Sequence, residues 1–208
     1  MESSQNIIIC VGRQLGAGGR DIGRMLAEQF EAKYYDRELL NLAAKESGFS
    51  ERFFEQNDEK KGFFRSLLNL QGTHLGSNGL YRSDISQESL FQFQSDAIRK
   101  AAEQGSCVFL GRCADYVLRD CPRLAAVFIT APLEFRVRQL MEKEGIEHAA
   151  ALKRIEQGES QRAAYYNYYT GKRWGQASSY DLCIDSSLLG IRQTGAFITE
   201  FIRKKFSL

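Results

Sequence analysis

The residues Asn6-Ile-Ile-Ile-Cys-Val11 run directly into Gly12-Arg-Gln-Leu-Gly16-Ala-Gly18-Gly19-Arg20-Asp21, and this succession decides the fold. The first stretch is short, apolar and rich in β-branched side chains, which predicts a buried strand of a parallel sheet. After the glycine-rich loop, apolar residues recur every three or four positions over residues 20–30 and predict an amphipathic helix. We therefore expect a strand, a loop and a helix in immediate succession.

The glycine-rich loop has the placement of an anion-binding site. Glycines between a buried strand and a helix let backbone N–H groups turn inward, where they and the helix N-terminus hold phosphate oxygens. The loop departs from the G-x-x-x-x-G-K-[ST] pattern, since it is one residue longer, Gly19 stands at the lysine position and Asp21 replaces the Ser or Thr. A tight structural turn that binds no ligand is the alternative interpretation.

Strand-like and helix-like segments alternate along the rest of the chain. Further buried strands are expected at residues 33–36, 107–110, 124–129 and 182–184. Helices are expected from residue 39 through 44 to a stop at Gly48, and at residues 88–103, 132–143, 147–169 and 191–204. This alternation predicts an α/β fold of three layers, with a five-stranded, mainly parallel sheet and helices on both of its faces.

The composition is that of an ordinary globular protein, and the length favours a single domain over residues 1–208. Hydrophobic residues make up 43% and charged residues 26% of the chain, so neither disorder nor a fibrous repeat is indicated. The net charge of +2 gives no broad field toward nucleic acid or an anionic membrane, and no apolar run reaches the roughly 20 residues of a membrane span. The polar start of the chain lacks the basic region of a signal peptide, so we expect a cytoplasmic protein.

Metal binding through cysteine or histidine is not indicated. The five cysteines form no C-x-x-C pair, and three of them lie in apolar, strand-like stretches, as small buried residues do in a reducing compartment. The two histidines, His74 and His148, are too few for a zinc site to be expected.

Residues 58–87 fit the alternating pattern poorly. They include four glycines, scattered polar residues and one brief apolar stretch. Loops of this length are often functional or disordered, so we expect a mobile insertion near a site. A surface loop without function is the alternative.

Short motifs in a fixed order run through nearly the whole chain. They are Gly16-Ala-Gly18, Leu26-Ala-Glu28, Tyr34-Tyr-Asp36, Phe109-Leu-Gly111-Arg112, Phe128-Ile-Thr-Ala-Pro132 with Arg136, Glu159-Ser-Gln-Arg162 and Tyr180-Asp-Leu-Cys-Ile-Asp185. Their order and spacing resemble the cytidylate kinase-like family, relatives of cytidylate kinase among the nucleoside monophosphate kinases. The resemblance implies a P-loop NTPase fold with a helical lid at about residues 136–174.

Three departures from cytidylate kinase concern the expected site. The loop lysine is missing, Leu110 stands where an Asp precedes Gly-Arg, and Leu42 stands where an arginine would follow the Asp36 segment. The variant loop with Gly-Gly-Arg is the one that the kinase-like branch shows. The loss of the lysine therefore looks like a family trait.

The resemblance implies phosphoryl transfer from ATP, with Mg²⁺, to a small acceptor. A nucleoside monophosphate such as CMP or dCMP is the first expectation for that acceptor. Phosphoryl transfer needs positioned phosphates and cations over the transferring group, and little covalent chemistry from the protein. The alternative is a nucleotide-binding regulatory protein that keeps the pocket without turnover.

The residues expected to carry this chemistry come from the loop, the strands that follow and the lid. ATP phosphates are expected at Gly12, Arg13, Gln14, Gly16, Ala17, Gly18, Gly19, Arg20 and Asp21. The expected catalytic cations are Arg20, Arg136 and Arg162, and the expected acceptor contacts are Asp36 and Arg112. Asp21 is also the expected Mg²⁺ ligand; a first-turn acid favoured by the helix dipole is the alternative. The alternative for the lid arginines is that they lie on a solvent-exposed helix face and have no catalytic role.

Residues 165–174 interleave aromatic and basic side chains. Packing of the lid helix against the body of the protein, or a contact in a homo-oligomer, accounts for such a stretch because aromatic side chains bury large areas. Contact with single-stranded nucleic acid is the alternative. We expect small nucleotides as ligands, and neither nucleic acid nor membrane as a partner.

Overall fold

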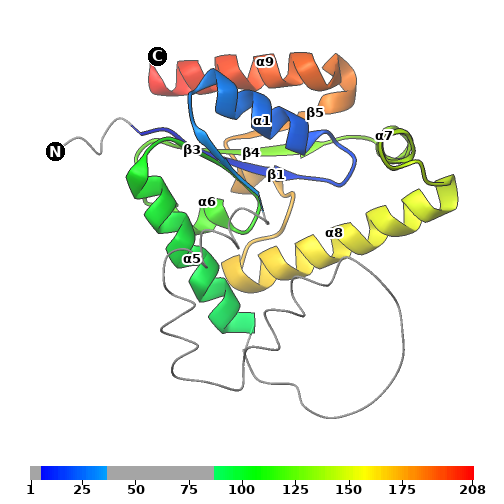
Figure 1. Cartoon of the computed structure of the whole chain (residues 1–208), viewed down its shortest axis with the longest axis horizontal. Coiled ribbons are helices and arrows are strands. Elements are labelled where there is room, and N and C mark those ends of the chain that lie inside the picture. Colours follow the sequence, from blue (N-terminus) through cyan, green and yellow to red (C-terminus); the bar gives the residue numbers. More distant parts are fainter. Residues whose placement is uncertain (1–5, 37–86) are drawn as a thin grey trace, which may run out of the picture.

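The computed structural model describes residues 6–36 and 87–208 of the chain. Within them, five strands form one parallel sheet in the order β2-β3-β1-β4-β5 (Figure 1). The strands are β1 (Ile8–Arg13), β2 (Lys33–Tyr35), β3 (Cys107–Leu110), β4 (Leu124–Thr130) and β5 (Leu182–Asp185). The helices are α1 (Gly19–Gln29), α5 (Gln87–Gln104), α6 (Ala114–Val117), α7 (Leu133–Glu144), α8 (His148–Thr170) and α9 (Ser186–Phe206), with a 3₁₀ turn at Ala177–Ser179.

Helices cover both faces of the sheet (Figure 1). Helices α1 and α9 pack on one face, where Leu26, Ile198 and Ile202 join the buried core. Helices α5 and α6 pack on the other face, where Ile98 and Ala114 do the same. This is the three-layer α/β arrangement predicted from the alternating pattern, and every described strand is parallel to its neighbours.

The central strand β1 shows why the sequence folds in this way. Successive side chains of a strand point to opposite faces, so a strand covered on both faces must be apolar throughout. Ile9 and Val11 belong to the core that α1 and α9 cover, whereas Ile8 and Cys10 belong to the core that α5 and α6 cover. All four side chains are buried, which explains the unbroken apolar run.

Helices α7 and α8 build a third apolar cluster, beyond the carboxyl ends of the strands (Figure 1). Val137 and Leu140 of α7 pack there against Ala151 and Ile155 of α8. Leu15, from the glycine-rich loop, packs against the same cluster. The loop and the two helices are therefore joined by apolar contacts and lie at the same end of the sheet.

The predicted elements within the described residues lie within two residues of the observed ones at both ends, apart from the last helix. That helix begins five residues early, at Ser186, but Gly190 (φ 76°) breaks it, and the part after the break matches the prediction. Helix α6 was not predicted, because its four residues are too few to show a periodic pattern.

Two predictions lie outside the described residues. One is the helix at 39–44, and the other is the mobile insertion at 58–87, of which only Gln87 is described, as the first residue of α5. Among the helices of residues 6–36 and 87–208, none combines the length and the apolar character needed to cross a membrane.

Candidate functional site

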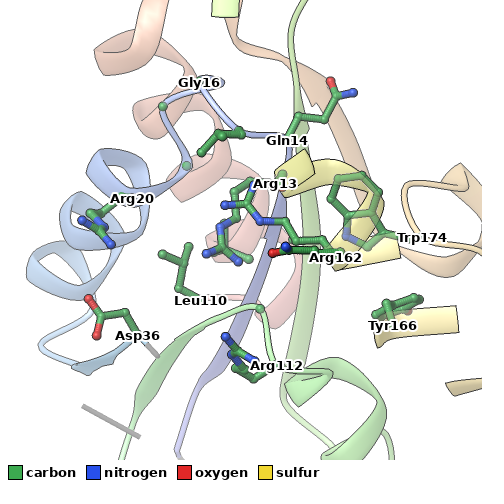
Figure 2. A pocket seen from close by; sticks show the side chains of 18 of the residues that line it. Arg13, Gln14, Gly16, Arg20, Asp36, Leu110, Arg112, Arg162, Tyr166 and Trp174 are labelled. Carbon is green, nitrogen blue, oxygen red and sulfur yellow. Dashed lines mark hydrogen bonds between the residues drawn. The ribbon is translucent and has the colours of Figure 1, made fainter. Parts of the chain in front are cut away.

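A cleft of about 740 Å³ opens at the carboxyl ends of the strands (Figure 2). The loop between β1 and α1 and the turn after β3 form one side of the cleft, and α7 and α8 form the other. In open parallel sheets, this end of the strands is where ligands bind. Figure 2 shows Arg13 and Arg162 in the middle of the cleft, Arg20 and Asp36 toward one side, and Trp174 toward the other.

Most of the expected site residues meet in this cleft. The residues that line it are Gly12, Arg13, Gln14, Gly16, Gly18, Gly19, Arg20, Asp21, Asp36, Arg112 and Arg162. Two expected residues do not line it. Ala17 is fully buried behind the loop, and Arg136 is buried between α7 and α8.

The loop between β1 and α1 has a backbone that requires its glycines. Gly16 (φ 85°) and Gly18 (φ 75°) adopt left-handed conformations, which residues with a side chain rarely take. A Cβ at Gly16 would lie 2.5 Å from the main-chain oxygen of Arg136, and one at Gly18 would lie 2.7 Å from Cγ1 of Ile191. Both glycines are thus required by the surrounding space as well as by conformation.

Backbone N–H groups of the loop are left without backbone partners. Those of Gly16 and Gly18 donate to no main-chain carbonyl in the part of the chain that the structure describes. The first N–H groups of α1, from Gly19 onward, have no partner within the helix. Inward N–H groups beside a helix N-terminus form a nest for an anion.

Two side chains fix the loop from behind. The hydroxyl of Ser186, at the start of α9, donates to the main-chain oxygen of Ala17 at 2.9 Å. Oε1 of Gln14 accepts a hydrogen bond from the hydroxyl of Thr130 and another from the backbone N–H of Ala131, at 3.2 Å. The amide oxygen of Gln14 therefore ties the loop to the end of β4.

Five arginines belong to the lining of the cleft: Arg13, Arg20, Arg112, Arg162 and Arg154, the last of which forms an ion pair with Glu144. Within the described residues, no carboxylate forms an ion pair with Arg13, Arg20 or Arg162. Burial, followed by the charges of Arg162 and Arg112, lowers the pKa of Arg13 to about 9. Burial likewise lowers the pKa of Arg162. Cations gathered in a partly buried cleft are stabilised by a bound anion.

The turn after β3 holds one of these arginines in a strained backbone. Gly111 (φ 75°), Arg112 (φ 60°) and Cys113 (φ 56°) are three consecutive residues in the left-handed region. Residues with a side chain enter that region at a cost of about 1–2 kcal/mol each, and such strain is concentrated at functional sites. The guanidinium carbon of Arg112 lies 5.4 Å from the centre of the Tyr165 ring. Asp36 is buried at the end of the neighbouring strand, β2.

The side chain of Arg136 bonds to protein groups outside the cleft. Its Nε donates to the main-chain oxygen of Ala131 at 2.8 Å, and its Nη1 lies 2.6 Å from Oε1 of Glu159. This pair joins the beginning of α7 to the middle of α8, one turn before Arg162. Of the three expected catalytic arginines, the structure brings Arg20 and Arg162 to the cleft and places Arg136 behind it.

The aromatic stretch packs the end of α8 against α5 and α6. The hydroxyl of Tyr166 donates to Oδ2 of Asp115 in α6 at 2.7 Å. The rings of Tyr169 and Phe91 in α5 are stacked, with 4.0 Å between their centres. For these tyrosines, the packing interpretation of the sequence analysis is the one that the structure shows.

Four residues that line the cleft in the structure are not assigned to the site from the sequence: Asp115 and the aromatic residues Tyr166, Trp174 and Tyr180. Burial raises the pKa of Asp115, while the hydrogen bond from Tyr166 opposes that shift. Asp115 follows Gly111-Arg112 closely, but nothing local distinguishes it from a surface acid. Its pairing with a tyrosine 51 positions away becomes visible only in the fold.

Asp21 stands at the rim of the cleft, in the first turn of α1. Its carboxylate accepts from Nζ of Lys143 at 3.1 Å, and both side chains are about half exposed. In residues 6–36 and 87–208 no group of three or more His, Cys, Asp or Glu side chains could hold a metal ion. Mg²⁺ in a kinase needs no such group, because one or two carboxylates hold it together with substrate phosphates and water. A single carboxylate beside the loop fits that kind of site.

Comparison with known proteins agrees with this geometry. A sequence model described as the Cytidylate kinase-like family matches residues 8–188. The chain is 26% identical over 193 residues to a protein named cytidylate kinase from Methanopyrus kandleri, covering 88% of this chain and 86% of that protein. The crystal structure of an uncharacterized protein from Eubacterium ventriosum is 26% identical, with a TM-score of 0.72 over 95% of this chain and 98% of the other.

A more distant solved structure shares the fold alone. A gluconokinase from Sinorhizobium meliloti is 12% identical, with a TM-score of 0.53 over 98% of this chain and 97% of the other. The sheet order, the glycine loop and this likeness give the P-loop NTPase fold. Because the family match spans nearly the whole described sheet and the cleft, the chain belongs to the cytidylate kinase-like family.

Proposed function

We propose that this protein transfers a phosphoryl group from ATP to a small acceptor, with CMP or dCMP as the first candidate. The observation that carries the proposal is the group of arginines, with Arg13, Arg20 and Arg162 among them, that share a cleft with loop N–H groups lacking a main-chain partner. Such a loop binds phosphate oxygens, and one guanidinium group can donate to two phosphate oxygens at once. The relative named as a cytidylate kinase supports a nucleoside monophosphate as the acceptor.

The residues of the cleft divide the work between them. The loop backbone from Gly16 to Asp21 holds the phosphates of ATP, and Asp36 with Arg112 holds the acceptor. Arg20 and Arg162 stabilise the charge on the transferring phosphoryl group, because this reaction depends on positioning and electrostatics. Residues 136–174 act as the lid of a single domain.

Arg136 has an indirect part in this scheme. Its buried pair with Glu159 fixes the turn of α8 that carries Arg162, so it is a positioning residue. Mg²⁺, held by Asp21 and the phosphates, would supply charge neutralisation across the phosphate oxygens.

An acceptor screen tests the proposal. The full chain is incubated with ATP, Mg²⁺ and one acceptor at a time, from the nucleoside monophosphates and small hydroxyl compounds, and the phosphorylated product is measured by mass spectrometry. Fastest transfer to CMP or dCMP supports the proposal, and fastest transfer to another compound changes the acceptor. Arg162→Ala, purified in the same way, shows whether the transfer comes from this site or from a contaminating kinase.

A second candidate is a nucleotide-binding regulatory protein without turnover. Gly19 at the lysine position favours it, because that lysine contacts the transferring phosphates in regular loops. ATP binding without transfer to any acceptor in the screen would establish this function in place of the first.

A further inference from the structure

The side chain of Arg13 runs through space that two glycines leave open. Arg13 is the last residue of β1, and its stem passes Gly19 at the start of α1. A Cβ on Gly19 would lie 2.6 Å from Cβ and 2.7 Å from Cγ of Arg13. The guanidinium ends against Gly111, where a Cβ would collide with Nη1 of Arg13. A side chain at either position would displace the arginine.

The glycine at position 19 is therefore tied to the arginine at position 13. The Cβ of any side chain at position 19 would lie too close to Cβ and Cγ of Arg13, so the fold cannot hold a lysine at 19 together with this arginine. Position 19 is where a regular phosphate loop carries its lysine. The space that a lysine at position 19 would occupy is thus filled by another cationic side chain, that of Arg13, which enters it from the preceding strand.

The surroundings of Arg13 are cationic. Within residues 6–36 and 87–208, its guanidinium makes no hydrogen bond and no ion pair. Its main-chain oxygen accepts from Nη1 of Arg162 at 3.3 Å, which brings a second guanidinium close. With a pKa of about 9, Arg13 is still charged at neutral pH. A charge partly withdrawn from water without a partner is costly, and an anion in the cleft would offset that cost.

We propose that Arg13 is the cation of this phosphate loop: its guanidinium contacts the terminal phosphates of ATP in place of the loop lysine, and Gly19 and Gly111 are glycines because they make room for it. The inference rests on the proposed function, since it deepens the assignment of ATP to this loop. A guanidinium presents a planar fork of donors, whereas an ammonium is a point charge. Arg13 therefore holds two phosphate oxygens at once.

Mutual exclusion makes a specific prediction about paired substitutions. Arg13→Ala removes the cation, and Gly19→Lys forces two side chains into one space, so each change alone should weaken phosphate binding. Combining Arg13→Gly with Gly19→Lys removes both the Cβ and the Cγ of residue 13 from that space and refills it with a lysine at the regular position. The double variant should bind better than either single variant.

The experiment measures binding of ATP and of inorganic tripolyphosphate to the full chain by isothermal titration calorimetry, with a melting curve for each variant. Arg13→Ala and Gly19→Lys are each expected to weaken binding of both probes on the order of tenfold to a hundredfold, the size of a lost charged hydrogen bond. Arg13→Lys should lose less than Arg13→Ala, because it keeps the charge. Arg24→Ala, an exposed arginine of α1 outside the cleft, is the control and should bind like the parent.

Each outcome decides between the two proposals. Unchanged tripolyphosphate binding by Arg13→Ala overturns the inference, as does a double variant that melts like the parent but binds no better than Gly19→Lys. If the double variant melts early, equal losses in Arg13→Ala and Arg13→Lys overturn it. Tripolyphosphate binding that depends on Arg13, without transfer to any acceptor, supports the inference and removes the proposed activity. If Arg13→Ala transfers phosphate at the parent rate, the proposed activity is supported and the inference about Arg13 is overturned.

Discussion

The two sides of the cleft are held in place by different means. The loop between β1 and α1 is shaped by its backbone, with two left-handed glycines and with β1 at the centre of the sheet. The opposite side, made by α7 and α8, is held by pairs of side chains, Arg136 with Glu159 and Tyr166 with Asp115. A single side-chain replacement should therefore disturb the α7–α8 side more than the loop side.

The largest effect is expected when the buried pair on the α7–α8 side is broken. In Glu159→Ala the guanidinium of Arg136 stays buried without its counter-charge. The free energy of unfolding should fall by about 3 kcal/mol, the lower end for such pairs because Glu159 is partly exposed. Urea denaturation followed by circular dichroism measures the change. Glu156→Ala, an exposed acid of the same helix, is the control, and an equal loss there would show that the pair does not hold α8.

Arg162→Ala tests the functional part of the same side. The guanidinium is expected to act chiefly in the transition state, so kcat should fall about a hundredfold or more, close to 2.7 kcal/mol, while ATP binding stays nearly normal. Steady-state kinetics and calorimetry with ATP separate the two quantities. Arg138→Ala, exposed on α7, should be mild. Transfer at the parent rate by Arg162→Ala would remove the role given to this residue.

Tyr166→Phe removes the second side-chain pair. The loss of its hydrogen bond to the Asp115 carboxylate should lower the free energy of unfolding by about 1.5 kcal/mol. Tyr168→Phe is the matched control, because the hydroxyl of Tyr168 bonds to Glu88 at an exposed site and such bonds contribute little. If both variants lost the same stability, the end of α8 would not be anchored through Asp115.

A side chain on the loop side should matter less. Ser186→Ala removes the hydroxyl that donates to Ala17 behind the loop, and about 1 kcal/mol of unfolding free energy is expected to go with it. ATP affinity should change little, since the loop conformation is set by its glycines. A loss as large as that of Glu159→Ala would break the comparison between the two sides.

The smallest effect is expected in the pH dependence of stability. Burial raises the pKa of Asp115 above the unfolded value of about 3.9, so the folded protein holds that proton more tightly. The stability that this group contributes is full below the unfolded pKa and is lost as the pH rises through the folded pKa. In Tyr166→Phe the pKa should rise further, because the hydrogen bond that lowers it is gone. An NMR titration of the Asp115 carboxyl carbon measures this, and a lower pKa in the variant would contradict it.

The sequence predicts the loop side more completely than the α7–α8 side. A backbone that needs left-handed residues at fixed places requires glycines there. The strand before the loop and the helix after it each show the spacing of apolar residues that is typical of their type. These are local signals, which is why the sequence alone places the loop and the five strands of the described sheet.

The α7–α8 side depends on contacts between distant residues. Arg136 was expected at the phosphates, yet it is buried against Glu159, 23 positions away, because the packing of α7 on α8 brings the two together. The pairing of Tyr166 with Asp115 spans 51 positions and crosses from one helix to another. No periodic pattern encodes such distances, so the roles of these residues emerge only from the fold.

The left-handed run after β3 limits which sequences can occupy that turn. Asparagine, aspartate and histidine enter the left-handed region more often than other residues with a side chain, so the backbone at positions 112 and 113 would accept them. Position 111 lacks this freedom, because any Cβ there would meet Arg13. Residue 113 is buried and leaves no room for a polar amide. In a library that randomises codons 111 and 112, clones selected for folding alone should drift toward asparagine at 112. Clones selected for phosphate binding should keep glycine at 111 and arginine at 112.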